Sequence, residues 1–198
     1  MKNIAILIFD GVEELDAVGP YEVFGTAATQ KDDVCNVYLV GETMDPVTCI
    51  LNMKLPPHYT FEDAPKPDIL IIPGGPGTRK AQHNEKLIEW VNKTAEGCEM
   101  VASVCSGARI TLTSGIAKGK RITTHWGVVE ELRERGEAAE VLEDVRFVRD
   151  GNYISSQGIS AGIDMSLWIV GQISDPAYAR LVQREIHYDP APPYAFDV

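Results

Sequence analysis

Short apolar runs alternate with stretches of helical periodicity along the whole chain. The apolar runs typical of buried strands lie at residues 3–9, 35–40, 68–72, 100–104, 121–124 and 153–156. Apolar residues at helical spacing predict helices at 20–27, 85–96, 106–115 and 128–135, a helix that follows 158–162 and runs through 165–170, and a last helix from 176 onward. This alternation predicts an α/β fold with a mainly parallel sheet, and we expect one domain over residues 1–198 because no linker or repeat interrupts it.

Turn and capping residues refine these boundaries. Pro20 fits the first turn of the first helix, and Pro176 fits the start of the last one. Asp150-Gly151 predicts a hairpin between 145–148 and 153–156, and residues 45–55 read as short strands or a hairpin.

Composition and charge exclude several classes of partner. The 198 residues carry a net charge of −11 and no basic run longer than a pair, which argues against nucleic acid and anionic membrane surfaces. The four cysteines form no C-x-x-C pair and no zinc-finger spacing with histidine. We see no signal peptide and no stretch of membrane-spanning length, so we expect a reducing cytoplasm and a small-molecule partner.

Cys105 lies where an apolar run ends and a helical pattern begins, with small residues around it. Such a strand–turn–helix junction lifts a side chain out of the carboxyl edge of the sheet, near helix N–H groups that favour a thiolate. A cysteine at the end of an apolar strand is more often a small buried hydrophobic residue chosen for its size. A nucleophilic role therefore needs an acid or base and an oxyanion site from elsewhere in the chain.

Three other loops follow strands at the same edge of the predicted sheet and can supply those groups. Asp16 follows the first strand; it either reaches Cys105, sharing one proton with it, or caps the helix near Pro20. Gly75 and Ser106 can offer backbone N–H groups to a developing negative charge, although the Gly74-Gly75 pair also suits a plain turn. His125 is either a base for Cys105 or a structural histidine.

Several motifs together resemble the DJ-1/PfpI superfamily. They are Gly11 to Pro20, Pro73 to Gly77, Val104 to Gly107, Thr123 to Trp126 and Gly158 to Leu167. Within that superfamily the chain is most similar to the isocyanide hydratase branch. The motifs that carry this similarity are residues 15–20, 103–105, 123–126, 158–164 and 188–193.

The resemblance implies a flavodoxin-like three-layer sandwich with a nucleophile elbow, and a homodimer. It implies Cys105 as nucleophile and Asp16 as acid/base, with Ile159 against the thiol and Gly75 and Ser106 bordering the pocket. In the isocyanide hydratase branch the thiolate attacks the isocyanide carbon to form a thioimidate, which water converts to an N-substituted formamide. No metal or organic cofactor is implied.

Departures from other branches narrow the choice of activity. The peptidase-like branch has histidine at the position of Ser106, so its absence here disfavours proteolysis. We associate threonine with this position in isocyanide hydratases, and serine preserves the hydroxyl group. Asp16 stands where the glyoxalase and deglycase branch has glutamate, which weakens that alternative without removing it. A third interpretation is a non-catalytic ligand sensor, or a redox sensor whose Cys105 oxidises.

Overall fold

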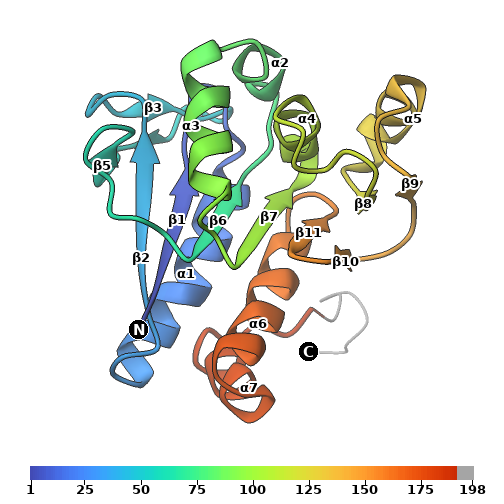
Figure 1. Ribbon diagram of the computed structural model, residues 1–198. Helices are drawn as coiled ribbons and strands as arrows, with labels where there is room; N and C mark the ends of the chain where they lie inside the picture. The colour runs from blue at the N-terminus through green and yellow to red at the C-terminus, as the bar shows by residue number, and fades with distance from the viewer. Residues whose placement is uncertain (191–198) are drawn as a thin grey trace.

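The computed structural model describes residues 1–190, and a seven-stranded sheet forms their centre (Figure 1). Its strands lie in the order β10-β11-β7-β6-β1-β2-β5, and every pair is parallel except β10 with β11. The strands are β1 (Lys2–Leu7), β2 (Cys35–Gly41), β5 (Tyr59–Thr60), β6 (Ile69–Ile72), β7 (Met100–Val104), β10 (Phe147–Asp150) and β11 (Tyr153–Ser156). The predicted mainly parallel α/β sheet is confirmed.

The central strands are the most apolar and the most buried. All four residues of β6 and the last four of β1 are buried, as expected for strands covered on both faces. Their register pairs Ile4 with Ile69 and Ile6 with Ile71, so β1 and β6 run side by side. Because β1, β6 and β7 are parallel, the loops that leave their carboxyl ends meet at one edge of the sheet.

Helices cover both faces of the sheet and make the three-layer sandwich (Figure 1). Helices α1 (Glu14–Gln30), α6 (Ala161–Ile173) and α7 (Pro176–Glu185) pack together on one face. The other face carries α2 (Thr78–Ala81), α3 (Glu85–Ala95) and α4 (Ala108–Thr113). A smaller unit beside the sheet comprises β8 (Arg121–Thr123), the short helix η2 (Trp126–Val128), α5 (Val129–Arg135) and β9 (Glu140–Leu142).

The predicted start of the first helix is wrong. Helix α1 begins at Glu14, so Pro20 lies inside it rather than in its first turn. Proline has no N–H to donate, so the carbonyl one turn earlier loses its helical hydrogen bond. Burial of Ala17, Gly19 and Pro20 compensates, because tertiary packing contributes more to helix stability than local propensity does.

Most of the other predicted boundaries are confirmed. Asp175 caps α7 by accepting a hydrogen bond from the Tyr178 N–H at 2.9 Å, and Pro176 follows as the first helical residue. The hairpin β10–β11 pairs Asp150 with Tyr153, and β3 (Val47–Thr48) pairs antiparallel with β4 (Lys54–Leu55). Elements β5, α2 and β9 were not predicted, and residues 191–193 of the last family motif lie outside the described residues.

None of the helices between residues 1 and 190 has the length and apolar character needed to span a membrane.

Candidate active site

Cys105 lies on a sharp bend directly after β7. Its backbone has a φ of +56°, in the left-handed region that non-glycine residues rarely adopt, and η1 (Cys105–Gly107) begins at this residue. A Cβ on Gly107 would lie 2.2 Å from the Ile72 carbonyl oxygen, so only glycine allows the bend to approach β6 this closely. The Thr124 hydroxyl donates to the Cys105 carbonyl at 2.8 Å and helps to hold the bend. This is the geometry of the predicted nucleophile elbow.

Asp16 is fully buried in the first turn of α1 beside Cys105. Its Oδ2 accepts a hydrogen bond from the Gly74 N–H at 3.0 Å, and Oδ1 has no conventional partner among the described residues. Burial raises the pKa of this carboxyl to about 7, and the Glu13 charge adds to the rise, while the Gly74 N–H and the Cys105 thiol oppose it. The alternative interpretation, in which Asp16 caps a helix near Pro20, is wrong because Asp16 lies within α1.

The thiol and the carboxyl titrate as a coupled pair. Burial and the Asp16 charge raise the pKa of Cys105 to about 12, whereas the Ser106 N–H and hydroxyl lower it. Two adjacent anions in a buried site are unfavourable, so above about pH 7 the pair keeps one proton, and the raised pKa of Cys105 keeps that proton on the sulfur. A thiolate next to a neutral acid forms when this proton passes from the sulfur to Asp16.

The loop after β6 lies directly against the elbow. A Cβ on Gly74 would lie 2.5 Å from the Ser106 nitrogen and 2.8 Å from the Cys105 Cβ. The Gly75 N–H donates to the Ser106 hydroxyl oxygen at 2.9 Å, so this amide positions a side chain instead of facing an oxyanion. The Ser106 N–H, by contrast, favours the thiolate form of Cys105, and the Gly74-Gly75 pair is more than a plain turn.

Gly158 brings the sulfur and His125 together. A Cβ at this position would lie 3.0 Å from the Cys105 Sγ and 2.5 Å from the His125 Cδ2. His125 accepts the Gly127 N–H at its Nδ1, at 3.1 Å, and so caps η2 with one ring nitrogen. Burial and the Arg109 charge lower the pKa of His125, which favours a neutral imidazole.

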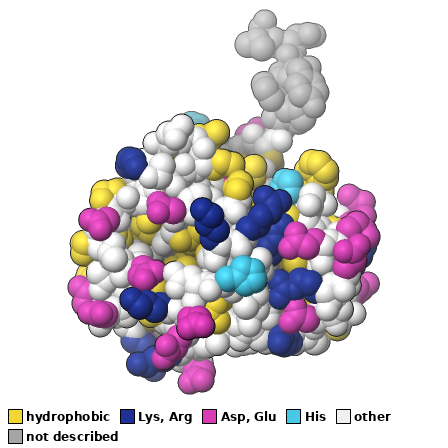
Figure 2. Space-filling view, turned by 90° about the horizontal axis from the view of Figure 1, so that it is seen from above, with side chains coloured by type: hydrophobic (Ala, Val, Ile, Leu, Met, Phe, Trp, Pro, Cys, Tyr) yellow, Lys and Arg dark blue, Asp and Glu magenta, His cyan; other side chains and the backbone are white. Residues whose placement is uncertain are grey.

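A hollow of about 440 Å³ opens beside this junction. Leu15, Trp126, Gly158 and Ile159 supply most of its apolar lining, and His125 also lines it. Cys105 is only 6 % exposed and does not line the hollow itself, but Gly158, which does, lies next to the sulfur. Side chains of both charges are interspersed on this end of the molecule, seen from above in Figure 2.

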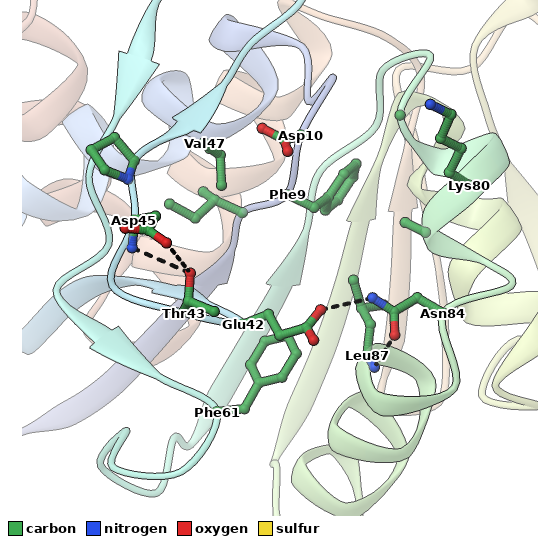
Figure 3. A pocket seen from close by; sticks show the side chains of 14 residues that line it. Phe9, Asp10, Glu42, Thr43, Asp45, Val47, Phe61, Lys80, Asn84 and Leu87 are labelled. Carbon is green, nitrogen blue, oxygen red and sulfur yellow. Dashed lines mark hydrogen bonds between the residues drawn. The ribbon is translucent and has the colours of Figure 1, made fainter.

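A second hollow, of about 370 Å³, lies between the ends of β1 and β2 and helices α2 and α3 (Figure 3). Its rim carries Asp10, Glu42 and Lys80, and Glu42 accepts a hydrogen bond from the Asn84 amide at 2.8 Å. None of its lining residues is a cysteine or belongs to the Cys105 site. Among residues 1–190, no group of three His, Cys, Asp or Glu side chains is placed to hold a metal ion.

The predictions from sequence did not include Arg109 and Thr78. Arg109 is 2 % exposed, forms an ion pair with Glu131 of α5, and donates from Nη1 to the Thr78 hydroxyl at 3.1 Å. A single charge within the apolar stretch 108–112 is the signal that identifies it. Thr78 has no comparable signal, because a threonine at the start of a helix is common.

The chain is similar to several known proteins. The model of the DJ-1/PfpI family matches residues 2–172. The chain belongs to the DJ-1/PfpI family. A family relative, isonitrile hydratase from Pseudomonas putida, is 37 % identical over 97 % of this chain and 81 % of its own length. A deglycase from Pyrococcus abyssi is 32 % identical over 78 % of this chain and 89 % of its own length.

A crystal structure of a ThiJ/PfpI family protein from Pseudomonas syringae has the same fold as this DJ-1/PfpI chain. It superimposes with a TM-score of 0.88 at 32 % identity, over 97 % of this chain and 77 % of that protein. The flavodoxin-like sandwich predicted from the motifs is confirmed, and the family includes enzymes.

Proposed function

We propose that the protein is a cysteine-dependent hydratase that adds water to small isocyanides and releases N-substituted formamides. The observation that carries this proposal is a buried carboxyl with a pKa of about 7 next to a thiol on a nucleophile elbow. The 37 % identical isonitrile hydratase supports the substrate class, since isonitrile is another name for isocyanide. The two-step mechanism set out in the next paragraphs requires neither a metal nor an organic cofactor.

In the first step the Cys105 thiolate attacks the terminal carbon of the isocyanide, and a carbon–sulfur bond forms. The Asp16 carboxyl gives its proton to that carbon, so the product is a thioimidate and Asp16 becomes a carboxylate. The Ser106 N–H lies beside the sulfur and stabilises negative charge there before the attack.

In the second step water adds to the thioimidate carbon, and Asp16 takes one proton from it. The second water proton reaches the nitrogen as the tetrahedral intermediate collapses. The carbon–sulfur bond breaks and the thiolate leaves. The formamide keeps one water proton on nitrogen, and its carbon-bound hydrogen is the proton that Asp16 gave in the first step. Asp16 ends protonated, so the cycle closes with only water consumed.

The hollow beside Cys105 supports a small apolar substrate. Leu15, Trp126 and Ile159 provide contact area for an aryl or alkyl group, while the isocyanide carbon points past Gly158 and His125 toward the sulfur.

The four free cysteines are all buried, which supports our expectation of a reducing cytoplasm.

Variants at the two central residues test the proposal. Cys105→Ala should abolish formamide production from an aryl isocyanide, and Asp16→Asn should lower kcat by a factor of about 100 or more, the size of a lost general acid. The readouts are chromatographic detection of the formamide and intact-mass detection of a covalent adduct on Cys105. Full activity of Cys105→Ala would refute the mechanism.

The deglycase relative supports a second candidate, in which Cys105 attacks reactive dicarbonyls. Incubation of the protein with methylglyoxal and an assay for lactate distinguishes the two reactions. Lactate production without formamide production would replace the first proposal with the second.

We also propose that two copies of the chain associate. Leu51, Trp126 and Leu15 are 75 %, 80 % and 38 % exposed, and the last two lie at the hollow. Covering these side chains in a homodimer would remove them from water next to the site. Light scattering that gives a monomer mass at micromolar concentration would contradict this.

A further inference from the structure

The second hollow combines an apolar floor with a charged rim (Figure 3). Phe9, Ala81 and Leu87 form the floor, and all three are buried in the core although they border the hollow. Phe61 adds an aromatic side chain, which Trp90 supports from outside the hollow by stacking on it with ring centroids 4.7 Å apart. The volume of about 370 Å³ is within the range of small-molecule sites.

Hydrogen bonds between the walls fix the shape of the second hollow. The Asn84 amide at the start of α3 donates to Glu42 after β2 at 2.8 Å, and the Asp10 carboxylate after β1 accepts the Thr48 N–H of β3 at 2.8 Å. Asn84 is itself held in place, because its side-chain oxygen caps α3 by accepting the Leu87 N–H at 3.2 Å. The hollow is therefore formed in advance, at the carboxyl edge of the sheet where ligands of open α/β folds bind.

Three charged side chains on the rim lack a partner of opposite charge. Among residues 1–190, neither Asp10 nor Asp45 nor Lys80 forms a salt bridge. Glu42 differs, since it accepts from Asn84 and its Oε1 lies 3.7 Å from the Lys86 ammonium. Asp10 and Asp45 lie on the wall formed by the loops after β1 and β2, and Lys80 lies on the α2 wall (Figure 3). Two unpaired carboxylates against one unpaired ammonium favour a cationic ligand.

We propose that the second hollow binds a small primary amine in its cationic form, with an aromatic or other apolar body. The body covers Phe9, Phe61 and Leu87, and the ammonium group lies at the rim beside Asp10 and Asp45. The aromatic side chains of the lining add to the attraction, because the face of an aromatic ring is negative. The proposal does not depend on the reaction at Cys105, since none of the lining residues belongs to that site.

An NMR titration of the full chain with 2-phenylethylamine at pH 7 tests the proposal. We expect saturable binding with a dissociation constant on the order of 1 mM or below, which about nine non-hydrogen atoms allow. Backbone shift changes should concentrate at Asp10, Gly77 and Asn84, which line the hollow. Changes confined to His125 and Gly158 would place the amine at the Cys105 site and would overturn the proposal, as would the absence of saturable binding.

The alcohol 2-phenylethanol separates the contribution of the charge from that of the apolar body. It has the same aromatic ring without the ammonium group, so it should bind about fivefold more weakly, the size of an exposed charge interaction. Equal binding of the alcohol and the amine would show that the carboxylates do not select the ligand, and the proposal would be wrong.

Variants of the rim should change the affinity for the amine in opposite directions. Asp45→Asn removes a carboxylate and should raise the dissociation constant about threefold to fivefold, whereas Lys80→Gln removes a like charge and should lower it by a similar factor. Asp32→Asn is the matched control, because it makes the same change in net charge at an exposed residue outside the hollow and should leave the constant unchanged. The same constant in Asp45→Asn and Lys80→Gln would contradict the proposal.

Ala81→Phe tests the floor, because it adds a ring where the body of the amine should lie, and it should abolish the shift changes. Circular dichroism shows whether this variant folds, and binding that persists in the folded variant would refute the proposed position. Asp45 and Lys80 are exposed, so the rim variants decide the question if Ala81→Phe does not fold. No isocyanide is present in these titrations, so their outcome is independent of the formamide assay.

Discussion

The buried carboxyl of Asp16 should make the protein less stable as the pH rises toward neutrality. The folded protein holds the Asp16 proton up to a pKa of about 7, whereas the unfolded chain releases it near its ordinary value of 3.8. Between these two values unfolding releases a proton, so the free energy of unfolding falls as the pH increases. Asp16→Asn has no such proton and lacks this dependence.

The size of the effect follows from the pKa difference. A shift of one pKa unit corresponds to 1.36 kcal/mol, so a rise from 3.8 to about 7 predicts a contribution on the order of 4 kcal/mol. The free energy of unfolding of Asp16→Asn, relative to the unmodified protein, should therefore increase by that amount from about pH 4 to about pH 7. Other titrating groups are common to both proteins and cancel in this difference.

Urea unfolding followed by far-UV circular dichroism measures the difference at each pH. The dependence on urea concentration, the m-value, should be equal in the two proteins, which shows that the same surface unfolds. Asp63→Asn is a control of opposite sign, because hydrogen bonds from Thr60 lower the pKa of Asp63 and its contribution is lost as the pH falls. Parallel stability curves for Asp16→Asn and the unmodified protein across this range would refute the reasoning.

Three further variants test the packing that supports the site, each by urea or thermal unfolding. Gly107→Ala places a Cβ 2.2 Å from the Ile72 carbonyl oxygen and should destabilise the fold by about 3 kcal/mol; an unchanged midpoint would mean that the elbow relaxes freely. Asp175→Ala removes the acceptor of the Tyr178 N–H and should lower the free energy of unfolding by about 1 kcal/mol. An unchanged free energy of unfolding would show that the cap is dispensable. Tyr153→Phe deletes a buried hydroxyl with two hydrogen-bond partners and should cost about 1 to 3 kcal/mol, whereas a neutral result would show that those partners re-pair.

The strands of the sheet could be predicted because burial on both faces demands continuous apolar runs. Residues 69–72 and 100–104 are such runs, and both form central strands. The start of α1 could not be predicted from local rules, since Pro20 favours a helix beginning later and only packing against the sheet and α6 favours the earlier start. Strands β5 and β9 have two and three residues and leave too short a pattern to detect.

The candidate site could be predicted as a set of loops but not as a set of contacts. Parallel topology alone brings Asp16, Gly75 and Cys105 to one edge of the sheet, and the structure places them there. The use of the Gly75 N–H depends on where the Ser106 oxygen lies to within an ångström, which residue spacing does not determine. The participation of Arg109 likewise depends on its reach to Thr78 across two separate elements.

Because the backbone at Cys105 is left-handed, the residue that would best stabilise the fold at this position differs from the residue that the chemistry requires. Glycine adopts a φ of +56° without steric cost, so Cys105→Gly would relieve backbone strain while removing the sulfur. Selection for thermal tolerance alone would accept that exchange, and selection for turnover would reject it. Which residue persists at this position in a laboratory population therefore reports which pressure the population experienced.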